Sequence, residues 1–324
     1  MQPLAVHDQS ADFAAAVRTG LAQPQKVIPA RYFYDRAGSE LFEQITELPE
    51  YYPTRTEIGI LKASAGAIAA AVGPGRAVVE FGSGSSLKTP LLLGAIAPAA
   101  YVPVDISAEF LQASAATLAA DFHGLQVLPV AADFTAPFRL PGAIAAQPKL
   151  GFFPGSTIGN LAPTAAVDLL RSFGLTLGGD SMLVIGFDLA PGDGKSVATL
   201  EAAYDDAAGV TAAFNLNLLH RINRELGGSI DVTNFAHRAV WNPLLGRIEM
   251  HLVALRATAF DAAGQRFSLT AGETIHTENS YKWSLAEIRL LARAAGWMPV
   301  ADWSDPAGLF SEQLWQRDGG ALQP

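Results

Sequence analysis

Residues 76–86 have the sequence RAVVEFGSGSS, and this stretch decides the fold class. An apolar run of strand length ends in the carboxylate of Glu80, and a Gly-x-Gly turn follows at Gly82 and Gly84. Glycine lets the backbone approach a nucleoside cofactor without a clash from a Cβ atom. We therefore interpret the stretch as a buried strand that leads into a cofactor-binding turn, although an ordinary strand-to-helix turn has the same pattern.

Four more short apolar runs follow this strand, with helical stretches between them. They are AYVPVDI at 100–106, LQVLPVAADF at 125–134, KLGFFPG at 149–155 and SMLVIGFDLA at 181–190. Such runs predict buried parallel strands in a doubly wound sheet. Ligands bind these sheets at the carboxyl ends of the strands, so the polar residues that end each run are the first candidates for a site.

The pattern changes after residue 196. A long helical stretch over 197–228 leads into alternating apolar and polar residues over 241–260 and 266–283. This alternation predicts an antiparallel sheet, inserted together with the helix into the core. A last helix over 285–296 and two apolar runs after it return to the main sheet.

The predicted fold class is therefore α/β, with a Rossmann-like core built on a mixed, mainly parallel sheet and a second α+β lobe that binds the substrate. The predicted core comprises residues 60–196 and 284–324, and the predicted lobe comprises residues 1–59 and 197–283.

The amino-acid composition argues against several classes of function. The 324 residues carry a net charge of −9, which argues against a nucleic-acid binder because phosphate recognition needs clustered Lys and Arg. Cysteine is absent, and no two of the six histidines have the i, i+4 spacing of a helical metal site, so we expect no metal. We also expect no membrane segment, a cytoplasmic location, a monomer and a small-molecule substrate.

Acidic residues end the next two predicted strands. Asp105 can accept hydrogen bonds from both ribose hydroxyls, and Asp133 can accept from an adenine amino group while the ring of Phe134 stacks on the base. Taken singly, each aspartate is more often a helix cap or a turn residue. Together with Glu80 they suit adenosine, and Leu87, in place of a third glycine, disfavours NAD.

The polar loop Gly155–Asn160 follows the fourth predicted strand, where the methyl acceptor lies in a methyltransferase of this topology. A purely structural alternative is a loop that caps the next helix. The loop also imitates the Gly-x-Ser-x-Gly elbow of serine hydrolases, but Thr157 stands in the place of the nucleophile.

Several stretches resemble the histidine-specific N-alpha-methyltransferases of ergothioneine biosynthesis. They are ARYFYDRAGSELFEQITELPEYYPTRTE (30–57), VEFGSGSSLKT (79–89), GFFPGSTIGNL (151–161), AYDDAAGVTAAFN (203–215), RIEMHL (247–252) and TENSYKWS (277–284). The resemblance implies a class I methyltransferase core, S-adenosyl-L-methionine as cofactor, and successive methylation of the α-amino nitrogen of L-histidine to hercynine.

The resemblance also implies roles for individual residues. The cofactor would be bound by Tyr34, Gly82, Lys88, Asp105, Asp133 and Phe134. The amino and carboxylate groups of the substrate would be bound by Tyr51, Asn160 and Tyr204, which are also the expected catalytic residues, while Met250 would line the pocket and Glu278 and Ser280 would hold the imidazole. A carboxylate and a hydroxyl suit a ring with one donor and one acceptor nitrogen.

Other interpretations stay open. Tyr34, Tyr51 and Tyr204 could equally be packed aromatic residues whose hydroxyls are hydrogen-bonded within the protein. Lys88 could be a solvated helix residue, Met250 a core residue and Glu278 a surface charge. The same family also includes relatives that act on thiohistidine-type or tryptophan-like amino acids. The resemblance therefore leaves these substrates as alternatives to histidine. Two further classes are a non-catalytic sensor of S-adenosylmethionine or an amino acid, and an NAD-dependent dehydrogenase.

Overall fold

A computed structural model describes residues 9–84, 87–106 and 108–318. The chain divides into two compact units. We call Pro53–Lys195 with Tyr281–Pro324 the core unit, and Met1–Tyr52 with Ser196–Ser280 the lobe unit.

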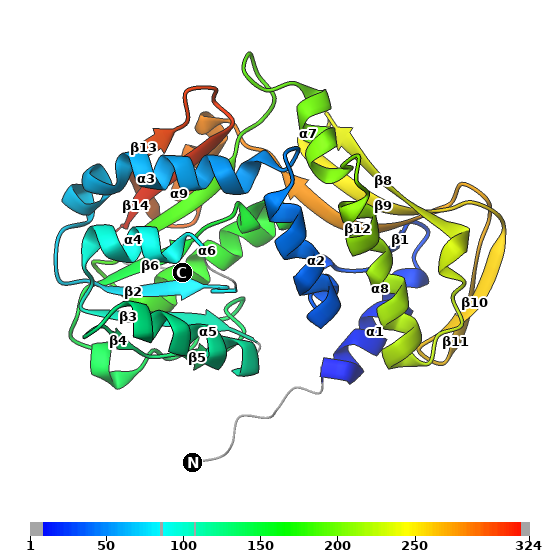
Figure 1. The fold of residues 1–324 in the computed structure, drawn as a ribbon, viewed down its shortest axis with the longest axis horizontal. Helices are drawn as coiled ribbons and strands as arrows, with labels where there is room; N and C mark the ends of the chain where they lie inside the picture. The colour runs from blue at the N-terminus through cyan, green and yellow to red at the C-terminus, as the bar shows by residue number, and fades with distance from the viewer. Residues whose placement is uncertain (1–8, 85–86, 107, 319–324) are drawn as a thin grey trace. The chain divides into compact units, whose positions relative to one another are not determined.

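The core unit is built on one sheet (Figure 1). Its strands are β2 (Ala77–Phe81), β3 (Ala100–Asp105), β4 (Gln126–Val127), β5 (Val130–Ala131), β6 (Lys149–Phe153), β7 (Met182–Asp188), β13 (Trp297–Ser304) and β14 (Phe310–Arg317). The order is β13-β14-β7-β6-β2-β3-β4, and β5 also pairs with β3. The strands β2 to β7 pair in parallel, and β14 runs antiparallel between β7 and β13.

Helices cover both faces of this sheet, as the continuous apolar runs predicted. They are α3 (Tyr52–Val72), α4 (Thr89–Ile96), α5 (Ala108–Asp121), α6 (Pro163–Leu177) and α9 (Leu285–Ala294). Residues of α3, α4 and α5 pack on one face, and residues of α6 and α9 pack on the other. Two short 3-10 helices, Gly142–Ile144 and Thr157–Asn160, lie in the loops on either side of β6.

The lobe unit combines helices with a separate sheet. The helices are α1 (Gln9–Leu21), α2 (Arg36–Glu47), α7 (Val197–Tyr204) and α8 (Val210–Leu226), with 3-10 turns at Ala30–Phe33 and Val232–Asn234. The sheet has the order β1-β12-β9-β8, formed by Lys26–Val27, Thr274–Tyr281, Arg247–Ala254 and Phe235–Asn242, and β10 (Thr258–Ala262) pairs with β11 (Gln265–Leu269). Aromatic contacts of Phe33 and Phe42 with Phe214 join the N-terminal segment to α8.

The predicted fold class is confirmed by this topology. The observed unit boundaries fall at 52/53, 195/196 and 280/281, where the sequence pattern suggested 59/60, 196/197 and 283/284. The first difference has a simple cause, because α3 is one continuous helix from Tyr52 whose Leu61 and Ile68 are buried in the core. Across the described part of the chain, every helix is too short or too polar to span a membrane.

Candidate functional site

The glycine-rich turn lies at the carboxyl end of β2, next to the end of β3. The amides of Gly82 and Ser83 both donate to the carbonyl of Val104, at 2.9 and 3.1 Å, which holds the turn beside Asp105. Gly82 has a φ of +76°, and a Cβ there would lie 3.3 Å from a ring carbon of Phe134. Gly82, Asp105 and Phe134 are therefore brought together, as the sequence predicted, while Ser85 and Ser86 lie outside the described residues.

Asp133 lies on the exposed loop just before Phe134. One of its oxygens accepts from the amide of Thr135 at 2.9 Å and from the Thr135 hydroxyl at 2.6 Å. This is an Asx turn, a structural role that aspartate commonly has in loops. It also fixes the carboxylate beside the half-buried ring of Phe134.

Glu80 differs from the other two acidic strand ends. Its side chain is buried inside the core, where it accepts hydrogen bonds from the hydroxyls of Thr89 and Tyr101. Burial raises the pKa of Glu80 to about 7, against the lowering effect of those two hydrogen bonds. Glu80 thus supports the first turn of α4 from below and is not exposed at the edge of the sheet to meet adenosine.

The acceptor loop, residues 155–160, is tightly held. Gly155 and Ser156 both have positive φ, of +81° and +53°, and the Ser156 hydroxyl accepts from the amide of Asp188 at 2.9 Å. A Cβ on Gly159 would lie 2.8 Å from the carbonyl oxygen of Tyr281, so only glycine fits there. Asn160 ends this loop as a half-buried side chain of the core unit.

Lys88 immediately precedes α4 and is mostly buried. Its ammonium forms an ion pair with the fully buried carboxylate of Glu57 on α3. Glu57 was not among the residues predicted from the sequence. The available signal was an acidic residue at a position whose helical neighbours, Ile60 and Leu61, face the core.

The lobe unit brings together five of the predicted residues. Tyr204 and Ser280 are both buried, and their hydroxyls are hydrogen-bonded to each other at 2.8 Å. The rings of Tyr51 and Tyr204 meet edge to face with centroids 6.1 Å apart. Desolvation of its hydroxyl, and the nearby groups of Glu278 and Tyr204, raise the pKa of Tyr34, although the residue as a whole is 44% exposed. Tyr34, predicted as a cofactor residue, therefore lies among the predicted substrate residues.

Met250 lies in the middle of β9 and is only 2% exposed. Its carbonyl accepts from the Thr277 hydroxyl at 3.0 Å, which ties β9 to β12. This position is that of a methionine in the hydrophobic core. Its role in lining a substrate pocket stays a prediction.

A buried ion cluster lies where the chain leaves and re-enters the core unit. Asp188, at the end of β7, pairs with Lys195 and, at 2.6 Å, with Lys282. Burial alone would raise the pKa of Asp188, but the two ammonium groups lower it, while burial lowers the pKa of Lys195 to about 8. The cluster fixes both ends of the segment that carries Tyr204 and Ser280.

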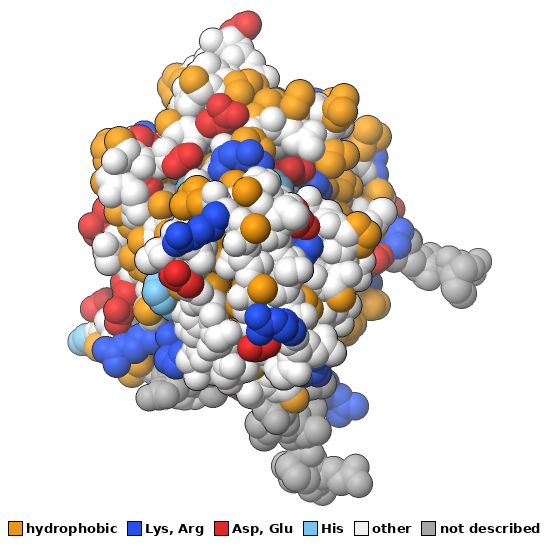
Figure 2. Space-filling model, turned by 90° about the vertical axis from the view of Figure 1, so that its right-hand side faces the viewer, with side chains coloured by type: hydrophobic (Ala, Val, Ile, Leu, Met, Phe, Trp, Pro, Cys, Tyr) orange, Lys and Arg blue, Asp and Glu red, His pale blue; other side chains and the backbone are white. Residues whose placement is uncertain are grey.

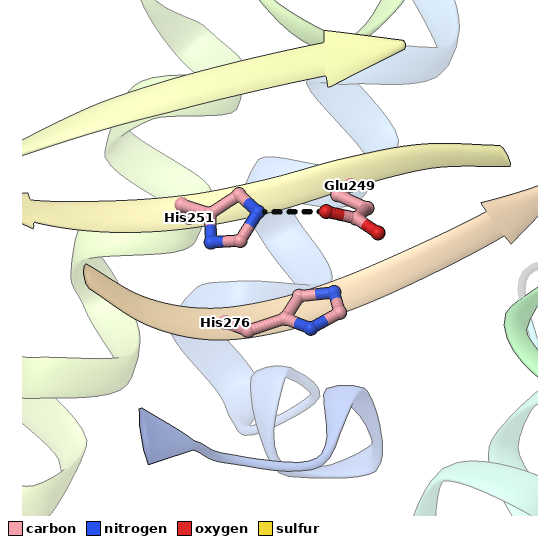
Figure 3. Close-up of side chains that lie close together, drawn as sticks. All are labelled: Glu249, His251 and His276. Atoms are coloured by element: carbon pink, nitrogen blue, oxygen red, sulfur yellow. Dashed lines mark hydrogen bonds and ion pairs between the residues drawn. The ribbon is translucent and has the colours of Figure 1, made fainter. Parts of the chain in front are cut away.

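A second polar cluster, Glu249, His251 and His276, lies on β9 and β12 (Figure 3). The three offer donor atoms within 4.8 Å of one another. Nε2 of His251 lies 3.2 Å from Glu249, and Nε2 of His276 lies 2.9 Å from the carbonyl of Glu278.

A guanidinium already contacts the carboxylate of this cluster. The guanidinium of Arg247 donates to Glu249 at 2.6 Å and partly neutralises it. Burial lowers the pKa of both histidines, so they are neutral hydrogen-bonding groups at neutral pH. The cluster supports the strand that carries Glu278, and independence from metal stays a prediction.

Comparisons with known proteins agree with the geometry. Residues 13–317 match the family described as "Histidine-specific methyltransferase, SAM-dependent". The chain is 40% identical over 308 residues to the histidine N-alpha-methyltransferases of Mycolicibacterium smegmatis and Mycobacterium tuberculosis, with 92% of each chain covered. It is 31% identical to ergothioneine biosynthesis protein 1 of Neurospora crassa, over 86% of this chain and 32% of that longer protein.

Proposed function

The chain belongs to the S-adenosylmethionine-dependent, histidine-specific methyltransferase family, and we propose that it methylates the α-amino nitrogen of L-histidine in successive steps to hercynine. The observation that carries the proposal is the buried polar group of the lobe unit, in which Tyr204 is hydrogen-bonded to Ser280. The similarity to two histidine N-alpha-methyltransferases over nine-tenths of the chain supports the substrate.

The cofactor turn fits S-adenosylmethionine. A side chain at position 82 would occupy the space beside the ring of Phe134, so glycine leaves room there for a flat nucleoside. We assign cofactor binding to Tyr34, Gly82, Lys88, Asp105, Asp133 and Phe134. When bound, the cofactor supplies a methyl group already activated by a sulfonium.

The residues of the chain then have to orient the amine and keep it neutral. Glu278 accepts a hydrogen bond from one imidazole nitrogen, and the Ser280 hydroxyl, held by Tyr204, pairs with the other. Asn160, Tyr51 and Tyr204 bind the amino and carboxylate groups. Orientation of a reacting amine accounts for several kcal/mol of a typical barrier, roughly 7 to 11 in the best cases.

A proton must leave the α-amino group before each transfer. The acceptor loop contains no histidine or cysteine to take it. We assign this step to a tyrosine hydroxyl of the lobe unit, Tyr51 or Tyr204, acting as a relay to water.

The remaining proposals concern the protein as a whole. We propose a cytoplasmic monomer that binds no nucleic acid. The face in Figure 2 supports the last point, because its basic and acidic side chains are interspersed and form no continuous basic patch. Light scattering of the purified chain tests the monomer directly.

The function is tested with purified protein, S-adenosylmethionine and a mixture of the standard amino acids, followed by mass spectrometry. Gain of one, two and then three methyl groups on histidine, with one S-adenosylhomocysteine released per methyl, is expected. Cofactor binding without methyl transfer to any amino acid would contradict the proposal and favour a sensor.

A further inference from the structure

The fully buried carboxylate of Glu57 contacts two loops of the core unit at once. Its oxygens accept from the amide of Gly155 at 2.8 and 3.0 Å, at the start of the acceptor loop. One of the same oxygens pairs with the ammonium of Lys88, at the end of the glycine-rich loop. The side chain of Glu57 is 0% exposed and that of Lys88 is 15% exposed, so water screens this pair little.

The surroundings are shaped to accept the carboxylate. A Cβ on Gly186 would lie only 2.5 Å from Oε1 of Glu57, so a glycine on β7 makes room for it. Gly155 has a φ of +81°, and a Cβ there would come within 3.4 Å of the Lys88 ammonium. Glycines at both positions therefore allow the two loops to close on one side chain.

Lys88 is the counter-ion that Glu57 depends on. Glu312 faces Gly186 in the neighbouring strand β14, and its carboxyl oxygens have no hydrogen-bond partner within the described residues. Burial, and then the charge of Glu57, raise the pKa of Glu312 well above its usual range. Lys88 is therefore the cationic partner that Glu57 contacts, and Glu312 is a second acidic group close to it.

We propose that Glu57 is a positioning residue that couples the glycine-rich loop to the acceptor loop. It contacts Lys88 at the end of the first loop and the Gly155 amide at the start of the second. It touches neither substrate nor cofactor in this role. The proposal rests on the proposed function, since Lys88 is assigned there to the cofactor and Asn160, on the acceptor loop, to the substrate.

The two contacts can be separated by mutation. Glu57→Gln keeps an oxygen for the Gly155 amide but turns an NH₂ group toward Lys88, which then loses its counter-ion. Glu57→Ala loses both contacts. Lys88→Met removes the ammonium alone, and Lys62→Met, on the exposed part of α3, is the matched control.

The test is a double-mutant cycle on the full chain, read by calorimetric binding of S-adenosylhomocysteine. Glu57→Gln and Lys88→Met should each raise the Kd about tenfold, and the double variant should bind no more weakly than Lys88→Met alone. At saturating cofactor, kcat should be kept in Glu57→Gln and fall about tenfold or more in Glu57→Ala. Lys62→Met should match the wild type.

Unchanged binding in Glu57→Gln, or additive losses in the double variant, would overturn the proposal and leave Glu57 a purely structural group. If Glu57→Gln does not fold, Glu57→Asp retains the charge on a shorter side chain. A lowered melting temperature with wild-type Kd and kcat in that variant would then overturn it, and a raised Kd would support it. Binding needs no histidine, so failure of the proposed substrate would appear separately as absent methylation by a wild type that still binds.

Discussion

The buried ionisable groups differ between the core unit and the lobe unit. The core buries carboxylates, among them Glu80 and Glu312 with raised pKa and Asp188 between two lysines. The lobe contains buried and half-buried histidines, and desolvation lowers the pKa of His237, His251 and His276. In the core, ion pairs fix loops at the ends of strands, whereas in the lobe hydrogen-bonding groups, among them Ser280 and Glu278, form the predicted imidazole site.

This difference indicates a division of labour. Charged anchors hold a cofactor turn in place whatever the acceptor is, and they carry no information about its side chain. Hydrogen-bonding groups such as Ser280 and Glu278 discriminate strongly, because a ligand that lacks the matching atom leaves them unpaired. Mutations in the two units should therefore change different kinetic quantities.

The largest effect is expected in the acceptor loop. Asn160→Ala should lower turnover about a hundredfold or more, because a loss of positioning of about 1 Å has effects of that size. Binding of S-adenosylhomocysteine should be kept. Steady-state kinetics beside a thermal melt checks this, and near-normal turnover by a folded variant would remove Asn160 from the site.

The side chains assigned to the imidazole should change recognition of the substrate. Glu278→Gln and Ser280→Ala should each lower kcat/KM for histidine about thirtyfold, equal to about 2 kcal/mol for a buried partner left unpaired. The cofactor Kd should not change. Ser268→Ala, exposed on β11, is the matched control for the serine. An equal loss of cofactor binding would mean that the two units do not divide the work.

A smaller effect is expected for the residue that orients Ser280. Tyr204→Phe removes the hydroxyl that lies 2.8 Å from Ser280. One hydrogen bond is worth about 1 kcal/mol, so KM for histidine should rise about fivefold. A larger fall in kcat than rise in KM would instead identify Tyr204 as the proton relay.

The sequence predicted the frame of the fold well. The runs ending at Phe81, Asp105, Phe153 and Asp188 are strands, because each is long, apolar and buried on both faces. The run over 125–134 forms only two two-residue strands, and Pro129, which has no N–H for the ladder, lies between them.

The site was predicted in part. Contacts between the ends of consecutive strands, such as Gly82 with the end of β3, follow from the topology of the sheet. The pairing of Glu57 with Gly155 joins residues 98 positions apart, and no local pattern encodes such a contact. The position of Tyr34 near Tyr204 and Glu278, two predicted substrate residues, is likewise a result of tertiary structure.

The two units should respond oppositely to acid. An unfolded histidine takes up a proton near pH 6.5, whereas the buried lobe histidines resist it, so lobe stability is present above that pH and is lost as the pH falls through it. Glu80, with its pKa raised to about 7, contributes stability that is present at low pH and is lost as the pH rises through that value.

Hydrogen exchange at pH 7.5 and 5.5, corrected for the intrinsic rates, compares the two units in one sample. Protection of β9 and β12 should fall relative to β2 and β3 at the lower pH. A uniform change across both sheets would contradict this contrast.

The smallest effect is expected from metal removal. If Glu249, His251 and His276 are a hydrogen-bonded support, chelation followed by gel filtration should leave kcat and KM unchanged. Loss of activity that Zn²⁺ restores would instead make the cluster a functional metal site.

The most direct test of the account is a one-pot competition among equal amounts of histidine, thiohistidine and tryptophan with limiting S-adenosylmethionine, followed by mass spectrometry. Histidine should be methylated first and should carry up to three methyl groups before either competitor is modified. Earlier methylation of thiohistidine or tryptophan would contradict the claim that Glu278 and Ser280 select an unmodified imidazole.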